Sequence, residues 1–401
     1  MSYNRGIMPL TTTEVLTRGV NQVLPGRESL LKLMEERPIR VYLGIDPTGN
    51  LLTLGHAVVL RKLQQFVELG HEVILLIGNG TVRIGDPTGR DSTRPTMTDA
   101  QIEENFATWQ SQASKILDFS KISLRHNGDW LDKLNFIDLV KLMAQTTTGQ
   151  LLERDMFQER IKAGQPIFGH EMLYPLLQGY DSVEMEVDLE IGGTDQTFNM
   201  MMGRTLLRNY KQKEKWVLTT PIINGLDGRK MSKSYGNFIA LTEEPNQMYG
   251  KLMSLSDEMM ADYFEILTEI PQEEVDQIRQ ALAAGEHPLP FKKRLALEIT
   301  SWLHTPELAE AAQEHFTATV QQKQLPDEMK EVSLQANSTL IEALSQAFPD
   351  HSKSHLRRLV EQGAVELWPD QVKPTDPNLV LETSVTTIKA GKRDFAQLKW
   401  L

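Results

Sequence analysis

Two lysines lie three residues apart on a segment predicted to be a flexible loop. Lys230 and Lys233 belong to the sequence KMSKS, which follows the turn-forming sequence NGLDGR. An ammonium group is a compact charge on a flexible stem, and a glycine-flanked loop can close over a ligand and open again. The pair therefore suits a polyphosphate that is gripped and then released. Taken by itself, a basic loop of this kind is equally often a solvated surface.

A second polar stretch lies where a predicted strand passes into a predicted helix. The apolar run at residues 41–46 is followed by Thr48, and a helical pattern then opens at Gly55 and His56. Glycine lets a nucleotide approach the backbone closely, and the N-terminus of a helix favours phosphate. His56 and Thr48 can donate hydrogen bonds to phosphoryl oxygens. A lone histidine here is more often a capping or packing residue, so this interpretation depends on the lysine loop.

A third group of polar side chains has helical spacing. Tyr174, Gln178 and Asp181 stand at positions i, i+4 and i+7, so a helix places them on one face. Each of them needs a polar partner, which makes this stripe a poor core face. A ligand that carries a hydroxyl, an amine and a carboxylate would supply such partners.

The elements that position these side chains alternate between strands and helices. Continuous apolar runs at residues 41–46 and 73–78 indicate strands buried on both faces, with a helix between them. A second unit starts with a strand at 185–191, turns at the sequence GGTDQ and continues as a helix from about 195 to 209. This alternation predicts a parallel sheet with right-handed crossovers, which binds ligands beyond the C-terminal ends of its strands.

The rest of the chain changes character twice. Helical patterns extend from about residue 243 to 325, and a polar stretch at 325–338 is typical of a linker. A last segment from about Ser338 combines a short helix with β-like runs.

The 42 basic and 54 acidic residues give a net charge of −12, which argues against a nonspecific nucleic-acid binder. Basic and acidic residues balance from Ser338 to Leu401, so a relatively basic module follows an acidic body.

Composition excludes several classes of function. The chain has no cysteine, which rules out disulfides, thiolate zinc sites, iron–sulfur clusters and cysteine nucleophiles. No segment approaches the roughly 20 apolar residues of a membrane span, and the N-terminal stretch lacks the apolar run of a secretion signal. We therefore expect a cytoplasmic protein without a membrane partner.

The motifs together resemble a known family of enzymes. The segments DPTGNLLTLGH and KMSKS resemble the two signature segments of class I aminoacyl-tRNA synthetases. GGTDQ and YPLLQGYDS are similar to segments of the bacterial tyrosyl-tRNA synthetases, and the likeness runs from Tyr42 through the C-terminal module. It implies activation of L-tyrosine with ATP to tyrosyl-adenylate and pyrophosphate, followed by transfer of tyrosine to the 3'-terminal adenosine of tRNA(Tyr). ATP would act as a substrate with Mg²⁺, and the protein would have no metal site and no tightly bound cofactor.

The resemblance also implies the architecture. It predicts an α/β fold with a Rossmann-like parallel-sheet catalytic domain over residues 1–228, whose connective insertion at about 130–170 forms the interface of a homodimer. The KMSKS loop and an α-helical anticodon domain would follow at 229–328. A linker and a small α+β RNA-binding domain, similar to a fold of the small ribosomal subunit, would occupy 329–401.

The site residues follow from the matched motif positions. Residues that act on the phosphates during activation would be Thr48, Thr53, His56, Lys230, Lys233, Arg90 and Arg94. Residues that contact tyrosine would be Tyr42 and Asp181 at the phenol, Asp86, Tyr174 and Gln178 at the α-amino group, and Gln196 near the carboxylate. Residues that contact ATP would be Gly44, Asp46, Gly55, Gly193, Asp195, Met231 and Lys233. Residues that hold RNA phosphates would be Lys353, Arg357, Arg358, Lys392 and Arg393.

One position departs from the family pattern. The first signature usually reads His-x-Gly-His, but Thr53 occupies the place of its first histidine. A threonine hydroxyl can still donate one hydrogen bond. The threonine side chain is shorter than that of histidine and cannot carry a positive charge. Because the rest of the constellation is intact, we expect Thr53 to substitute for the histidine.

Two alternatives stay open at this stage. A tryptophanyl enzyme would share the fold, but the Tyr42 and Asp181 pair suits a phenol better than an indole N–H. A site that bonds a hydroxyl strongly rejects the analogue that lacks it, a rule for which tyrosyl-tRNA synthetases are the standard example. A non-catalytic RNA-binding relative is the second alternative, motivated by Thr53 and the basic C-terminal module.

Overall fold

The computed structural model describes residues 10–88, 98–321, 329–391 and 394–401. The predicted site residues Arg90, Arg94, Lys392 and Arg393 lie outside these ranges. Two compact units make up the chain, one formed by residues 1–244 with 251–305 and the other by 245–250 with 306–401. The three domains expected from the sequence, with boundaries at 228 and 328, stay a prediction.

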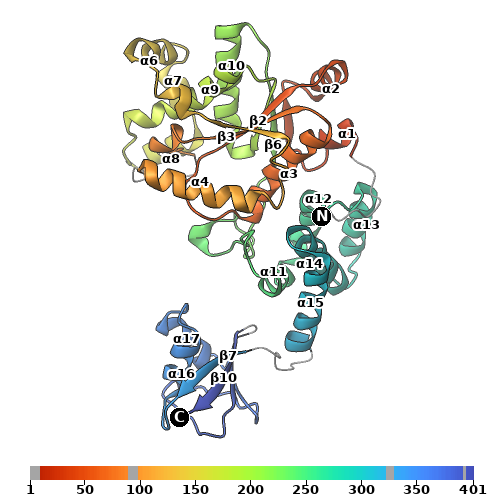
Figure 1. Ribbon diagram of the computed structural model, residues 1–401, viewed down its shortest axis with the longest axis vertical. Coiled ribbons are helices and arrows are strands. Elements are labelled where there is room, and N and C mark those ends of the chain that lie inside the picture. Colours follow the sequence, from red (N-terminus) through yellow and green to blue (C-terminus); the bar gives the residue numbers. More distant parts are fainter. Residues whose placement is uncertain (1–9, 89–97, 322–328, 392–393) are drawn as a thin grey trace. The chain divides into compact units, whose positions relative to one another are not determined.

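A six-stranded sheet forms the centre of the first unit. Its strands in spatial order are β1 (Gln22–Leu24), β6 (Trp216–Thr220), β5 (Leu189–Gly193), β2 (Arg40–Ile45), β3 (Glu72–Ile77) and β4 (Ile122–His126). All neighbours are parallel except β1, which pairs with β6 in the antiparallel sense. The sequence-based prediction of a parallel sheet in an α/β fold is therefore confirmed (Figure 1).

The helices of the chain alternate with these strands and then continue without them. In chain order they are α1 (Thr12–Val15), α2 (Arg27–Glu36), α3 (Leu54–Glu68), α4 (Asp99–Ala113), α5 (Gly128–Leu131), α6 (Phe136–Met143), α7 (Thr148–Leu152), α8 (Asp155–Lys162), α9 (Tyr174–Met185), α10 (Thr197–Lys211), α11 (Pro245–Met253), α12 (Met260–Leu267), α13 (Gln272–Ala283), α14 (Leu289–Leu303), α15 (Pro306–Phe316), α16 (Leu340–Ala347) and α17 (Lys353–Glu361). Short 3₁₀ turns are η1 (Thr81–Arg83), η2 (Gly169–Met172), η3 (Thr194–Gln196), η4 (Lys233–Tyr235) and η5 (Asp257–Met259), and η6 (Thr317–Gln321) is a π-helical turn. Within the described ranges, none of these helices combines the length and hydrophobicity that crossing a membrane requires.

The strand expected at 185–191 begins later than predicted. Met185 still belongs to α9, and Glu186 takes a left-handed conformation with φ of 48°, which ends the helix. β5 therefore starts at Leu189. The predicted start was wrong because Met185 and Val187 are apolar and buried, so in the sequence they extend the apolar pattern of the strand toward the N-terminus.

Helices cover both faces of the sheet. α3 packs against β2, β3 and β5, while α10 packs against β5, β6 and α9 (Figure 1). The crossing of α9 and α10 is close because Gly179 and Gly203 meet there. A Cβ placed at Gly179 would lie 2.9 Å from Leu206 Cδ1 and 3.1 Å from the backbone nitrogen of Gly203. The absence of side chains at the two glycines therefore allows α9 and α10 to cross closely.

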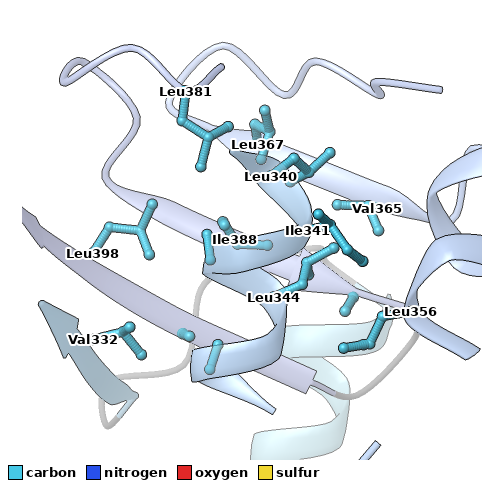
Figure 2. Packing of buried hydrophobic residues seen from close by; sticks show 14 of the residues in the cluster. Val332, Leu340, Ile341, Leu344, Leu356, Val365, Leu367, Leu381, Ile388 and Leu398 are labelled. Carbon is cyan, nitrogen blue, oxygen red and sulfur yellow. The ribbon is translucent and has the colours of Figure 1, made fainter. Parts of the chain in front are cut away.

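The C-terminal part of the second unit is a small α+β module. Its four strands lie in the order β7 (Lys330–Leu334), β10 (Asp394–Trp400), β9 (Thr387–Ala390) and β8 (Val365–Trp368). β7 is parallel to β10, and the remaining pairs are antiparallel. α16 and α17 bring buried residues such as Leu344 and Leu356 into a core with the strand residues Val332, Ile388 and Leu398 (Figure 2).

The polar stretch at 325–338 is not wholly a linker, because it contains β7. Val332 and Leu334 are buried in the core of the module, whereas Lys330, Glu331 and Ser333 between and before them are exposed. Only every second residue of the strand is apolar. Its polar face gave the segment the composition of a linker.

Replacing Gly179 with alanine is expected to lower the free energy of unfolding by about 1–3 kcal/mol, because the added methyl group meets backbone atoms of α10 that cannot move independently. Gly149→Ala is the matched control. Its Cβ would contact only Thr147 Oγ1 at 3.8 Å, so the change in stability should stay below about 1 kcal/mol. Urea-induced unfolding of the two variants measures the difference, and equal effects would contradict the close crossing of α9 and α10.

Candidate active site

A cavity of about 350 Å³ opens at the C-terminal ends of β2 and β5. These two strands are neighbours in the sheet, and the chain continues from them toward opposite edges, which is where open α/β sheets bind ligands. The predicted site residues that line the cavity are Gly44, Asp46, Thr48, Thr53, Gly55, His56, Asp86, Tyr174, Gln178, Asp181, Gly193, Asp195, Gln196, Lys230 and Met231.

Backbone hydrogen bonds tie the two signature segments together. The N–H of Leu54 donates to the carbonyl of Ile239 at 3.0 Å, and the N–H of Leu241 donates to the carbonyl of Leu52 at 2.9 Å. Residues 52–54 lead into α3, and residues 239–241 follow the KMSKS loop. The short ladder therefore holds the start of α3 and the lysine loop at the same end of the cavity.

The lysine loop contacts the glycine-rich segments. A Cβ at Gly49 would lie 3.3 Å from Lys233 Nζ, and a Cβ at Gly55 would lie 3.8 Å from Met231 Sδ. Lys230 Nζ lies 3.0 Å from Asp195 Oδ2. The structure therefore brings the loop to the turn after β2, to the start of α3 and to the turn after β5.

His56 lies in the cavity wall as a neutral group. The backbone N–H of Thr53 donates to His56 Nδ1 at 3.1 Å, and the Thr53 hydroxyl lies 3.0 Å from the same nitrogen. Burial, together with the positive charge of Lys233, lowers the pKa of His56 to about 4. Because Nδ1 accepts a hydrogen bond, the proton of the neutral ring lies on Nε2. His56 is thus a hydrogen-bond donor at neutral pH and not a cation.

Thr53 is linked to His56 rather than isolated at the motif position. Its side chain is buried, lines the cavity and contacts the histidine ring as described. A residue that both faces the cavity and orients the second motif histidine is consistent with the expectation that Thr53 substitutes for the first one, which stays a prediction.

The opposite end of the cavity contains a row of linked carboxylates and hydroxyls. The hydroxyl of Tyr174 donates to Asp46 Oδ2 at 2.9 Å, and the other oxygen of Asp46 accepts from Thr81 at 2.8 Å. Burial and the negative charges of Asp46 and Asp86 raise the pKa of Tyr174 well above its usual range, so its hydroxyl keeps its proton. Asp46, expected at ATP, thereby also orients the tyrosine expected at the amino group.

Asp86 is held by residues on both sides of the cavity. Its Oδ1 accepts from the backbone N–H of Thr88 at 2.9 Å, and its Oδ2 accepts from Gln196 Nε2 at 2.8 Å. Arg154, at the start of α8, donates to the Thr88 hydroxyl at 2.7 Å. Arg154 belongs to the segment expected to be a connective insertion, and it contacts the residue that orients Asp86 without lining the cavity itself. The sequence did not single it out.

The side-chain amide of Gln178 has a hydrogen bond at its nitrogen but none at its oxygen among the described residues. Its Nε2 donates to Glu190 Oε1 at 3.1 Å, while its Oε1 is buried without a hydrogen-bond partner among the described residues. An amide oxygen in this position is an acceptor that lacks a donor. A ligand ammonium group in the cavity would supply one.

Asp181 closes the deep end of the cavity. Asn127 Nδ2 donates to its Oδ2 at 3.1 Å, and Trp130 Nε1 donates to its Oδ1 at 2.8 Å. Burial raises the pKa of Asp181 well above its usual range. Sequence reasoning missed both donors, although Asn127 follows directly after β4, at the strand end where ligand residues are expected.

Tyr42 lies next to the cavity but does not line it. Its side chain is fully buried in β2 and does not belong to the cavity lining, and its hydroxyl lies 2.9 Å from Ser182 Oγ. The contact of Tyr42 with a substrate phenol stays a prediction. Tyr42 lies behind the wall, in contact with the helix that carries Asp181.

The predicted RNA contacts lie in the other compact unit. Lys353, Arg357 and Arg358 are exposed on α17, while Leu356 and Val360 of the same helix are buried. Ser352 caps this helix by accepting from the N–H of His355. The structure thus gathers three cations on the outer face of one helix, as the amphipathic pattern predicts.

Replacing Lys233 with methionine should raise the pKa of His56, because the removed positive charge no longer opposes protonation of the ring. Lys230→Met is the control, since Lys230 pairs with Asp195 and does not contribute to the low pKa of His56. NMR titration of the His56 ring signals measures both variants against the unchanged chain. An upward shift in neither variant would show that the lysine loop does not approach the start of α3.

Comparison with known proteins agrees with this geometry. Residues 34–321 match the family model of class I tRNA synthetases (W and Y). The chain is 46% identical to a tyrosine–tRNA ligase of Moorella thermoacetica, with 96% of this chain and 94% of the relative covered. It is 43% identical to a tyrosine–tRNA ligase of Thermotoga maritima over 97% of this chain and 98% of the relative.

Solved structures share the fold at lower identity. A tyrosyl-tRNA synthetase from Archaeoglobus fulgidus complexed with L-tyrosine superposes with a TM-score of 0.60 at 22% identity, covering 75% of this chain and 98% of that one. A C-terminally truncated mitochondrial tyrosyl-tRNA synthetase from Aspergillus nidulans gives a TM-score of 0.62 at 21% identity, covering 74% and 89%. The sequence matches cover nearly the whole chain, and both signature segments converge on one cavity. The chain therefore belongs to the class I tyrosyl-tRNA synthetases.

Proposed function

We propose that the cavity carries out both steps of tyrosine–tRNA ligation. L-Tyrosine and ATP form tyrosyl-adenylate and pyrophosphate, and tyrosine then passes to the 3'-terminal adenosine of tRNA(Tyr). The observation that carries this proposal is the backbone ladder between residues 52–54 and 239–241, which brings the start of α3 and the lysine loop to one cavity. A module that only bound RNA would not need this arrangement.

Activation at this site needs no nucleophilic side chain. The carboxylate of tyrosine attacks the α-phosphorus of ATP, a new P–O bond forms, and pyrophosphate leaves with the electrons of the broken bond. The protein contributes by holding the reactants in line and by stabilising negative charge on the phosphoryl oxygens. We assign this role to the neutral Nε2–H of His56, the hydroxyls of Thr48 and Thr53, and the ammonium groups of Lys230 and Lys233. Arg90 and Arg94 are proposed to assist at the pyrophosphate.

The deep end of the cavity is proposed to hold the amino acid. The unpartnered oxygen of Gln178 would accept from the α-ammonium group, beside the Tyr174 hydroxyl and the Asp86 carboxylate. Asp181 would meet the phenol hydroxyl. Gln196, already bonded to Asp86, would lie at the substrate carboxylate.

The outer end is proposed to hold ATP between the two turns. Gly44, Asp46 and Gly55 line the side of β2 and α3, and Met231 closes the cavity from the lysine loop. A Cβ at Gly193 would lie 2.7 Å from Asp195 Oδ1, so a glycine is needed for the carboxylate to sit there. Asp195 now pairs with Lys230. Lys230 contacts Oδ2 of Asp195, and the second oxygen of this carboxylate is proposed to accept from a ribose hydroxyl.

Mg²⁺ is proposed to arrive with the phosphates of ATP. Across the described part of the chain, no group of three or more His, Asp or Glu side chains gathers into a metal site. The residues present do not form a cage for the ion, and we assign no catalytic step to it.

The C-terminal module is proposed to hold the tRNA backbone. Lys353, Arg357 and Arg358 are exposed cations on one helix, and such groups position phosphates without reading bases. Lys392 and Arg393 would extend this surface. We also propose a cytoplasmic location, because the charged tRNA is used there.

A homodimer is proposed on the exposed apolar face of α6. The side chains of Phe136, Ile137, Val140 and Met143 recur with helical spacing and are 75%, 55%, 49% and 37% exposed. Contiguous apolar patches of this kind mark interfaces. The helix lies within the segment at about 130–170 that was expected to join two copies.

Replacing Lys233 with alanine is expected to slow adenylate formation by about 10²-fold or more, because a donor to the transition state is lost, while the affinity for tyrosine changes little. Single-turnover rates and tyrosine binding are measured separately. Lys211→Ala, which removes a surface lysine paired with Glu186, is the control and should leave both unchanged. If Lys233→Ala lowers the rate of adenylate formation and the affinity for tyrosine to the same extent, Lys233 does not act on the phosphates. If the unchanged protein catalyses no tyrosine-dependent exchange between ATP and pyrophosphate, the proposed function is wrong.

Replacing Val140 with aspartate is expected to convert the dimer to monomers, because a charge would be buried in an apolar contact. Sedimentation equilibrium should give twice the 45.5 kDa chain mass for the unchanged protein and a single chain mass for the variant. Val372→Asp is the control, because Val372 is 53% exposed in the C-terminal module. A monomeric unchanged protein, or a variant that stays dimeric, would contradict the interface on α6.

A further inference from the structure

A buried ion pair lies directly behind the cavity. Glu190 in β5 and Lys215, one residue before β6, have side chains that are 2% and 0% exposed, and Lys215 Nζ contacts Glu190 Oε2. Charged side chains are rarely buried to this extent. Glu190 itself lines the cavity, whereas Lys215 lies farther back.

All three hydrogens of the Lys215 ammonium group have acceptors. Besides Glu190, they donate to Ser182 Oγ at 2.8 Å and to the carbonyl of Met200 at 3.1 Å. The space for the ammonium group depends on Gly203, because a Cβ there would lie 2.5 Å from Lys215 Nζ. Lys215 is therefore locked in one position by β5, α9 and α10.

The remaining oxygen of Glu190 determines how the Gln178 amide is turned. Glu190 Oε1 accepts from Gln178 Nε2 at 3.1 Å. An ionised carboxylate is an acceptor only, so it selects the amide nitrogen and leaves the amide oxygen on the other side. That oxygen is the buried acceptor without a partner among the described residues.

Stability alone does not account for such a pair. Removing two charges from water is costly, and apolar replacements of buried ion pairs are often neutral or stabilising. The geometry indicates another role for the pair, because Glu190 lines the cavity and orients the Gln178 amide in the cavity wall. Lys215 places its ammonium group against Glu190 Oε2, so the two buried charges compensate each other beside the cavity.

We propose that Glu190, held in place by Lys215, is a positioning residue that directs the Gln178 oxygen toward the α-ammonium group of bound tyrosine. This inference rests on the proposed function, since it requires tyrosine in the cavity. A neutral amide at position 190 could donate to the Gln178 oxygen, and the Gln178 side chain would then be free to present its nitrogen to the substrate. The ammonium group would face a donor in place of an acceptor.

The test compares two ligands that differ only at the amino group. L-Tyrosine and 3-(4-hydroxyphenyl)propionate share the phenol and the carboxylate, but the second lacks the amine. In Glu190→Gln, the affinity for tyrosine should fall by about tenfold or more, because a hydrogen bond to a charged group is lost, while the affinity for the second ligand stays within about twofold. The ratio of the two dissociation constants is the decisive quantity. A merely structural role would weaken both ligands equally and leave this ratio unchanged.

Two further variants keep the experiment conclusive. Glu190→Gln combined with Lys215→Met removes both buried charges, so it avoids an uncompensated ammonium group and should show the same change in the ratio. Lys213→Met is the matched control, because Lys213 pairs with Asp188 near the start of the same strand and does not line the cavity. It should leave the ratio as it is in the unchanged protein.

The outcomes separate this inference from the proposed function. If the unchanged protein does not bind tyrosine, the proposed function fails. If it binds tyrosine but the ratio is unchanged in both Glu190 variants, the positioning role of Glu190 is overturned. A change in the ratio in the Lys213→Met control as well would also overturn it, because the effect would then not be specific to the buried pair.

Discussion

Two backbone hydrogen bonds between residues 52–54 and 239–241 are the constraint on which the site depends. Side-chain contacts of a loop can change, but backbone hydrogen bonds fix where the lysine loop is anchored. The start of α3 and the segment after the lysine loop are separated by nearly half the chain, yet they are hydrogen-bonded to each other at one end of the cavity. Every assigned role at the phosphates presupposes this anchoring.

The cavity is polarised from end to end. The carboxylates of Asp86 and Asp181 lie toward its deep end, and the ammonium groups of Lys230 and Lys233 lie at its mouth. An ammonium group is attracted inward and a polyphosphate is attracted outward, so a ligand with both is oriented by charge before any specific hydrogen bond forms. The buried pair of Lys215 and Glu190 adds no net charge to this gradient, which is consistent with a role in orientation.

Much of this arrangement follows from local patterns. Continuous apolar runs identify β2 and β3, and the spacing of Tyr174, Gln178 and Asp181 places all three on the cavity side of α9. Other features depend on tertiary pairing. Glu190 lies beside Tyr42 only because β5 pairs with β2 in one particular register, and the Lys215 ammonium group has room there only because Gly203 has no side chain. Tyr42 could be matched to a motif, but its burial behind the wall could not be read from the motif.

The order of strands in the C-terminal module has a consequence for its assembly. Among the described residues, β7 pairs only with β10, which lies about 60 positions later in the chain and is an interior strand of the sheet. During synthesis, β7 stays unpaired while α16, α17, β8 and β9 leave the ribosome. Closure of this sheet is therefore a late event, and a nascent chain interrupted before residue 394 would carry an exposed strand edge that invites association with other chains.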